Sequence, residues 1–120
     1  MNPIQLDIQQ LRIKHILFKS KLRSVLYGGN YDEIFFSESG PVGQWFIQTG
    51  WPKYSSLSQL QELHTLNLDL NRQAKLLITL YNNSKIEEAH DGLRAIDLKS
   101  DRFLSLLSEI EQNPEARTLF

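Results

Sequence analysis

Histidine is the residue type in this sequence that points most directly to chemistry. The 120-residue chain has three histidines and no cysteine, which excludes thiolate ligands, cysteine nucleophiles and disulfides. His15 and His64 fall within apolar residues spaced at helical intervals, whereas His90 lies at the edge of such a run. Helical bundles build metal sites from inward-facing side chains on neighbouring helices. Two imidazoles alone bind zinc weakly, because zinc takes four ligands, or three and a water.

Motifs for catalysis are absent from the sequence. No glycine-rich phosphate loop opens a helix, and no serine occupies a nucleophile elbow. The carboxylates fall mostly on outward helix faces, which is typical of a solvated surface. We therefore expect no catalytic residues and no enzymatic activity.

Three long stretches with apolar residues every three or four positions predict amphipathic helices. Ser84 is the expected N-cap of the last helix, with Glu87 completing a capping box. The short turn before Ser84 makes the last two helices antiparallel. The expected helices run from Pro3 to Gly28, from Ser55 or Ser56 to Asn82, and from Ser84 to Pro114.

The segment between the first two long helices, residues 30–54, is rich in aromatic residues and breaks the helical periodicity. Exposing a large apolar side chain costs about 2 kcal/mol, so we expect this segment to fold over one end of the bundle. A short helix is expected from Gly43 to Thr49. The predicted fold is all-α: a four-helix-type antiparallel bundle of three long helices and this short aromatic-rich one. It forms a single domain, residues 1–120, with a short tail at 113–120.

Charge is nearly balanced overall, at −1, but it is unevenly distributed. All charges between Ile8 and Tyr31 are basic, whereas residues 86–115 carry eight acidic and three basic side chains. Complementary charge on two neighbouring helices explains this pattern better than a phosphate site, and no nucleic-acid partner is expected. No apolar run approaches the ~20 residues that cross a bilayer, and no signal peptide is evident. We expect a cytoplasmic protein that does not bind membranes.

Three separated pieces of the sequence carry a family resemblance. They are His15-Ile16-Leu17, the run from Gly40 through Gly43 to Trp45, and His64. In order and spacing they resemble the chemoreceptor zinc-binding (CZB) domain. That family has His-x-aromatic-or-Leu, then Cys-x-apolar-Gly-x-Trp, then His-x-x-x-His. The resemblance covers the chain from about Ile4 to Ile110.

Two of the four ligand positions depart from the family pattern. Gly40 stands at the cysteine position, and Leu68 stands at the second histidine of His-x-x-x-His. The resemblance therefore leaves His15 and His64 as a degenerate half-site, with tight zinc binding lost and no cofactor expected. It assigns Gly43 and Trp45 a structural role, and Leu68 indicates an apolar interior where zinc would lie. Nearby substitutes for the lost ligands would be Glu38, Ser39 or His90.

The resemblance implies a non-catalytic bacterial regulatory or sensory module that forms a homodimer and passes a signal to a partner protein. The signal would come from that partner, or from a ligand between His15, His64 and Trp45. One alternative is a helical adaptor whose histidines are ordinary core residues. In that case Asn67 and Asn71 would form a polar layer that sets the register of a helix interface. Another alternative is a haem protein with His15 and His64 as axial ligands.

Overall fold

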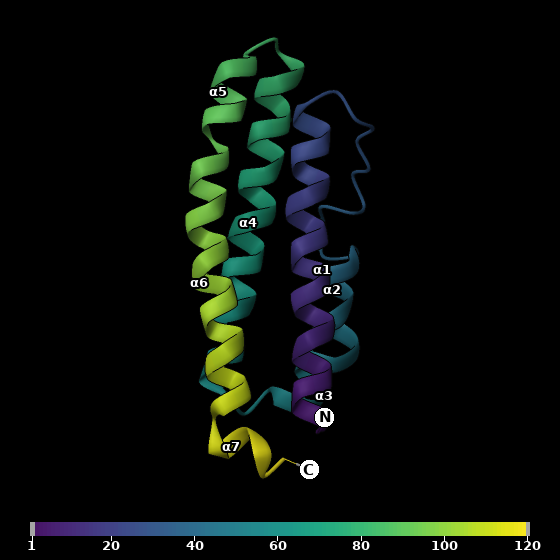
Figure 1. Ribbon diagram of the computed structural model, residues 1–120. Helices are drawn as coiled ribbons and strands as arrows, with labels where there is room; N and C mark the ends of the chain where they lie inside the picture. The colour runs from purple at the N-terminus through teal and green to yellow at the C-terminus, as the bar shows by residue number, and fades with distance from the viewer. Residues whose placement is uncertain (1, 120) are drawn as a thin grey trace.

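The computed structural model describes residues 2–119, within which every regular element is helical and no strand occurs (Figure 1). Three long helices run along a rod of 51 × 23 × 22 Å. They are α1 (Pro3–Leu26), α4 (Ser58–Asn82) and α6 (Leu93–Gln112). The expectation of an all-helical fold is confirmed. None of the described helices is both long and apolar enough to span a membrane.

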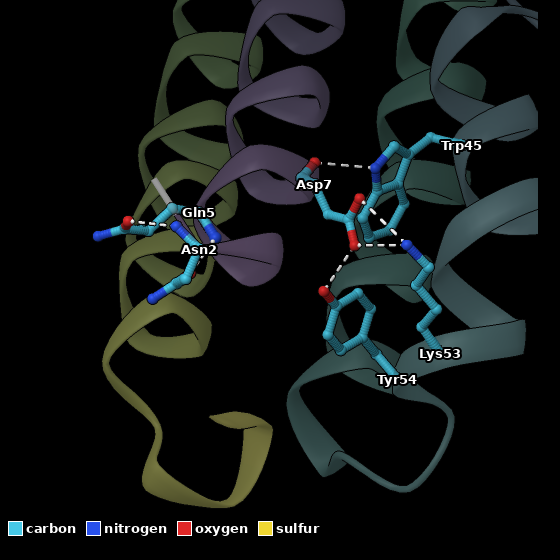
Figure 2. Close-up of polar contacts among 6 residues, drawn as sticks. All are labelled: Asn2, Gln5, Asp7, Trp45, Lys53 and Tyr54. Carbon is cyan, nitrogen blue, oxygen red and sulfur yellow. Dashed lines mark hydrogen bonds and ion pairs between the residues drawn. The ribbon is translucent and has the colours of Figure 1, made fainter. Parts of the chain in front are cut away.

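Helix α1 begins where the sequence predicts. Pro3 occupies its first turn, and Asn2 is the N-cap. The Asn2 side chain accepts a hydrogen bond from the backbone N–H of Gln5 at 2.9 Å, and the Gln5 side chain accepts one from the backbone N–H of Asn2 at 3.1 Å (Figure 2). This reciprocal pair satisfies two N–H groups at the helix start. Every predicted apolar position of α1 is buried: Ile4, Ile8, Leu11, Phe18, Leu22 and Val25.

The aromatic segment lies along the side of α1 (Figure 1). The expectation that it would cover one end of the bundle is therefore wrong. It also contains more helix than predicted. Three short pieces follow one another without a gap: α2 (Pro41–Trp45), a π-helical turn η1 (Phe46–Gly50) and α3 (Trp51–Tyr54). Pro52 lacks the N–H that an α-helix would pair with the carbonyl of Gln48, and the chain widens just before it. Four aromatic side chains of the segment are buried: Phe36, Trp45, Phe46 and Tyr54.

The serines predicted to begin the two later helices, Ser55 or Ser56 and Ser84, do not cap them. Leu57 is the N-cap of α4, because the helical aromatic segment continues to Tyr54 and leaves Ser55 and Ser56 in the turn. Ser84 has a positive φ of 65° and ends α4. The N–H of Lys85 bonds to the carbonyl of Leu80 at 2.9 Å, which closes a Schellman-type helix end. The left-handed backbone thus makes Ser84 part of the end of α4.

The last predicted helix is divided into parts. α5 (Ile86–Asp91) and α6 are separated at Gly92, and α7 (Pro114–Arg117) forms one further turn near the C-terminus. Glycine has a poor helix propensity, which accounts for the interruption. Pro114 ends the long helix, as expected, because proline cannot continue it. α5 and α6 run back along α4 (Figure 1), in agreement with the expected antiparallel turn.

Two ion pairs join α1 to α6. Arg12 of α1 pairs with Glu111 of α6 at 2.8 Å, and Lys19 pairs with Asp97 at 3.1 Å. Partly exposed pairs of this kind contribute little stability, up to about 1 kcal/mol each. Their main effect is to favour one pairing of helix faces. Two of the five basic residues of α1 thus pair with acidic residues of α6, which agrees in part with the expectation of complementary helices.

Asn67 supplies a test of core packing. Within residues 2–119 its buried Nδ2 atom has no hydrogen-bond partner. Asn67→Leu should therefore raise the free energy of unfolding by about 1 kcal/mol, because it removes an unsatisfied amide. Thermal denaturation measures the gain. Asn71→Leu is the control, since Asn71 borders an open surface cavity where water can solvate its amide. A loss of stability in Asn67→Leu would show that the amide has a partner in solution.

Candidate functional site

His15 is a core residue held by α6. Its side chain is buried, and its Nε2 lies 2.6 Å from the Oγ of Ser100. Its ring stacks on Phe103 with centroids 4.3 Å apart. Burial, and to a smaller extent the nearby Lys19, lowers the pKa of His15 from 6.5 to about 4. The imidazole is therefore neutral at physiological pH, with one ring nitrogen already paired.

His64 lies in a different environment. It is half-buried on α4, and its Nε2 is 3.4 Å from Oε1 of Glu38. The rings of Phe46 and Trp51 approach it edge-on, each with centroids 5.1 Å away. Of the substitute ligands considered from the sequence, Glu38 is the one that lies beside this histidine. His90 instead contacts the carbonyl oxygen of Leu26 at 2.5 Å.

The side chains of the two histidines lie among different neighbours. His15 faces α6, whereas His64 faces the aromatic segment, and no hydrogen bond, ion pair or ring contact of the described residues joins them. Among residues 2–119, no group of three or more histidine, aspartate or glutamate side chains is placed to hold a metal ion. A zinc ion or a haem iron needs donors that converge on one point. The arrangement of these donors fits neither group.

The backbone at Gly40, where the CZB pattern has cysteine, cannot accommodate a side chain. A Cβ atom built at Gly40 would collide with the backbone carbonyl oxygen of Phe35. The close approach of these two backbone segments therefore requires glycine. At the second lost position, Leu68 is 36% exposed and borders a surface cavity. The expectation that Leu68 marks an apolar interior is wrong, because this position of α4 faces outward.

Gly43 and Trp45 lie where the aromatic segment packs most closely on its neighbours. A Cβ atom at Gly43 would collide with the carbonyl oxygen of Glu38, so the turn before α2 could not close on a larger residue. Trp45 is buried, and its indole N–H donates to the backbone carbonyl of Asp7 at 3.0 Å (Figure 2). This hydrogen bond connects α2 to α1.

A buried carboxylate completes the contact between the aromatic segment and α1. Oδ2 of Asp7 accepts a hydrogen bond from the Tyr54 hydroxyl at 2.7 Å and lies 3.1 Å from Nζ of Lys53 (Figure 2). Burial, together with the bond to Asp7, raises the pKa of Tyr54. Sequence reasoning missed these residues. The signal was an aspartate at an apolar helical position, three residues after Ile4 and four before Leu11.

The outer face of α1, opposite its buried stripe, is the second feature that sequence reasoning missed. Its apolar members are each about half exposed: Leu6, Ile13, Ile16 and Leu17. The exposed, uncharged polar residues Gln9, Ser20 and Ser24 lie on the same side. Leu6, Ile13 and Ser20 follow at intervals of seven, which places them on one side of a helix. That spacing was the signal that could have revealed the face.

A cleft of about 330 Å³ adjoins this outer face. Ile16, Ser20 and Arg23 of α1 line one side, and Leu93 and Leu104 belong to the opposite side. The apolar outer face therefore continues into a groove between α1 and the helix that follows Gly92. The groove and the outer face together form a candidate binding surface on α1.

His15 makes stability depend on pH. The unfolded imidazole takes up a proton near pH 6.5, whereas the folded one does so near pH 4, so the unfolded state binds more protons in this window. The free energy of unfolding should therefore fall as pH drops from 6.5 to 4, by up to about 1.4 kcal/mol per pH unit from this group. Denaturant unfolding of the wild type and His15→Gln measures the difference. Equal slopes in the two proteins would contradict this account.

Asp7→Ala should lower the free energy of unfolding by about 2–4 kcal/mol, because it removes a buried partner of Lys53 and Tyr54. Denaturant unfolding measures this loss. Tryptophan fluorescence is a suitable signal, because Trp45 bonds to the backbone of Asp7. The matched control is Asp101→Ala, which removes an exposed aspartate from α6 and should change stability by less than about 0.5 kcal/mol. Equal losses in both variants would show that the buried contact is not stabilising.

Comparison of the chain with protein-family models, with curated proteins and with solved structures finds no match. The resemblance to the CZB domain therefore remains a prediction that depends on the three spaced motifs of the sequence. Among the described residues, the candidate sites are His15 and His64, whose side chains have separate partners, and the apolar outer face of α1.

Proposed function

We propose that this chain is a non-catalytic helical module that acts by binding another protein through the outer face of α1. The single observation that carries the proposal is the exposure of that face. Ile13 is 58% exposed and Ile16 is 55% exposed, in the middle of a long helix whose inner side already forms the core. Exposed apolar side chains grouped on one face of a helix are typical of interaction sites.

The scaffold agrees with the regulatory module implied by the CZB resemblance. If Pro41–Tyr54 is counted as one short helix beside the three long ones, the chain has the elements of a four-helix-type bundle. On this proposal Gly43 and Trp45 preserve the scaffold, and the metal chemistry has been replaced by packing. His15 pairs with Ser100 and His64 with Glu38, so each former ligand has a structural partner.

An unnatural photo-crosslinking residue tests the proposal in the source cells. Placed at Leu17, in the outer face, it should give one discrete adduct, which the additional change Ile13→Glu should abolish by adding charge to the face. The matched control is the same residue at Leu98 of α6, which is 68% exposed and should give none. Crosslinking at both positions, or at neither, would contradict the proposal.

Zinc titration of the purified chain tests the metal part of the same proposal. Two histidines with separate partners should give no stoichiometric zinc binding, because a tight site needs three or four converging ligands. Calorimetry of the wild type and of the double variant His15→Gln, His64→Gln should show the same weak response. One zinc per chain that is lost in the double variant would overturn the inference that the metal chemistry is gone.

A further inference from the structure

The outer face of α1 is bordered by positive charge on both sides. Lys14 and Lys21, seven residues apart, lie along one edge, and Lys19 and Arg23, four residues apart, lie along the other. Lys19 is already paired with Asp97 of α6. No carboxylate of residues 2–119 pairs with Lys14, Lys21 or Arg23. The face therefore has an uncharged, mainly apolar centre. Lys14 and Lys21, which lies over the Phe35 ring, form one basic edge, and Arg23 beside the Lys19–Asp97 pair forms the other.

The cleft beside α1 gives this face a pocket. It opens between Ile16 and Ser20 on one helix and Leu93 and Leu104 on the other, with Arg23 also on its wall. Its volume of about 330 Å³ is large enough for one large apolar side chain. A partner that rests on the outer face can insert such a side chain here and place an acidic group near Arg23. Buried anchors of this kind carry most of the binding energy at protein interfaces.

A second copy of this chain fits the face poorly. Two α1 helices packed face to face place the basic edges of one copy against those of the other, whether they run parallel or antiparallel. Apart from the buried Asp7, α1 has no acidic residue to offset this repulsion. Like charges along a helix pair disfavour the pairing. The homodimer implied by the CZB resemblance therefore does not use this face.

We propose that the outer face of α1 and the adjoining cleft bind an amphipathic helix of another protein, with an apolar seam flanked by glutamate or aspartate. This inference rests on the proposed function and specifies the chemistry of the partner. The seam covers Leu6, Ile13 and Leu17, and one large apolar side chain fills the cleft. The acidic flanks pair with Lys14 and Lys21 on one side and with Arg23 on the other. Helix-in-groove binding uses anchors at this spacing.

Two synthetic helical peptides test this inference with the 120-residue chain. Both have the same heptad seam of leucines, and the flanking positions are all glutamate in one and all lysine in the other. Fluorescence anisotropy at low and high salt measures their affinities. The glutamate peptide should bind about tenfold more tightly at low salt, and the advantage should shrink as salt screens the charges. Ile13→Glu should weaken its binding about thirtyfold, whereas the control Leu98→Glu should leave it unchanged.

Three outcomes would overturn the inference. Equal binding of both peptides would show that the basic edges do not select the partner. No binding of either, while the crosslink at Leu17 is still formed in cells, would reject this partner chemistry and leave the proposed function standing. A dimer in analytical ultracentrifugation that Ile13→Glu dissociates would make a second copy the occupant. Circular dichroism of Ile13→Glu verifies that the variant is folded.

Discussion

Asp7 accepts hydrogen bonds from Lys53 and Tyr54 within the core, and its backbone carbonyl accepts one from Trp45. These contacts dock the aromatic segment against one side of α1 (Figure 2). A buried carboxylate is costly without partners, so the segment must stay where its donors can reach Asp7. The position of the segment decides which side of α1 is covered. The opposite side remains exposed and becomes the candidate binding face, so the surface depends on a contact inside the molecule.

Close backbone packing and separate hydrogen-bonding partners determine the surroundings of the glycines and histidines of the three motifs. Gly40 and Gly43 let backbone segments approach so closely that neither position admits a side chain without movement of the chain. The remaining histidines stabilise the fold through different neighbours. His15 bonds to Ser100 between α1 and α6, and His64 lies among Glu38 and two aromatic rings. Because the two histidines have separate partners, adding one cysteine or histidine nearby would not by itself make their side chains converge.

Helix α1 combines two surfaces of different character. Its inner stripe holds the core, and its outer face carries apolar side chains that the core does not use. The charges lie on the borders between the two, where Arg12 and Lys19 pair with α6 and leave the outer face uncharged. An apolar face with basic borders is more selective than an apolar face alone, because a partner must match both the seam and the charge.

The sequence by itself determined the helical class, the burial of α1's inner stripe and the pairing of a basic helix with an acidic one, because periodicity and charge are local properties of the chain. Predictions from the sequence were wrong where contacts with other parts of the chain overrode a local signal. Ser84 looks like an N-cap but ends α4, since the preceding helix imposes a left-handed backbone there. Leu68 looks like a core residue but faces outward. Asp7 looks like a surface residue but is buried. Its hydrogen-bond donors, Lys53 and Tyr54, lie 46 and 47 residues further along the chain. Only tertiary structure decides which side of a helix its neighbours cover.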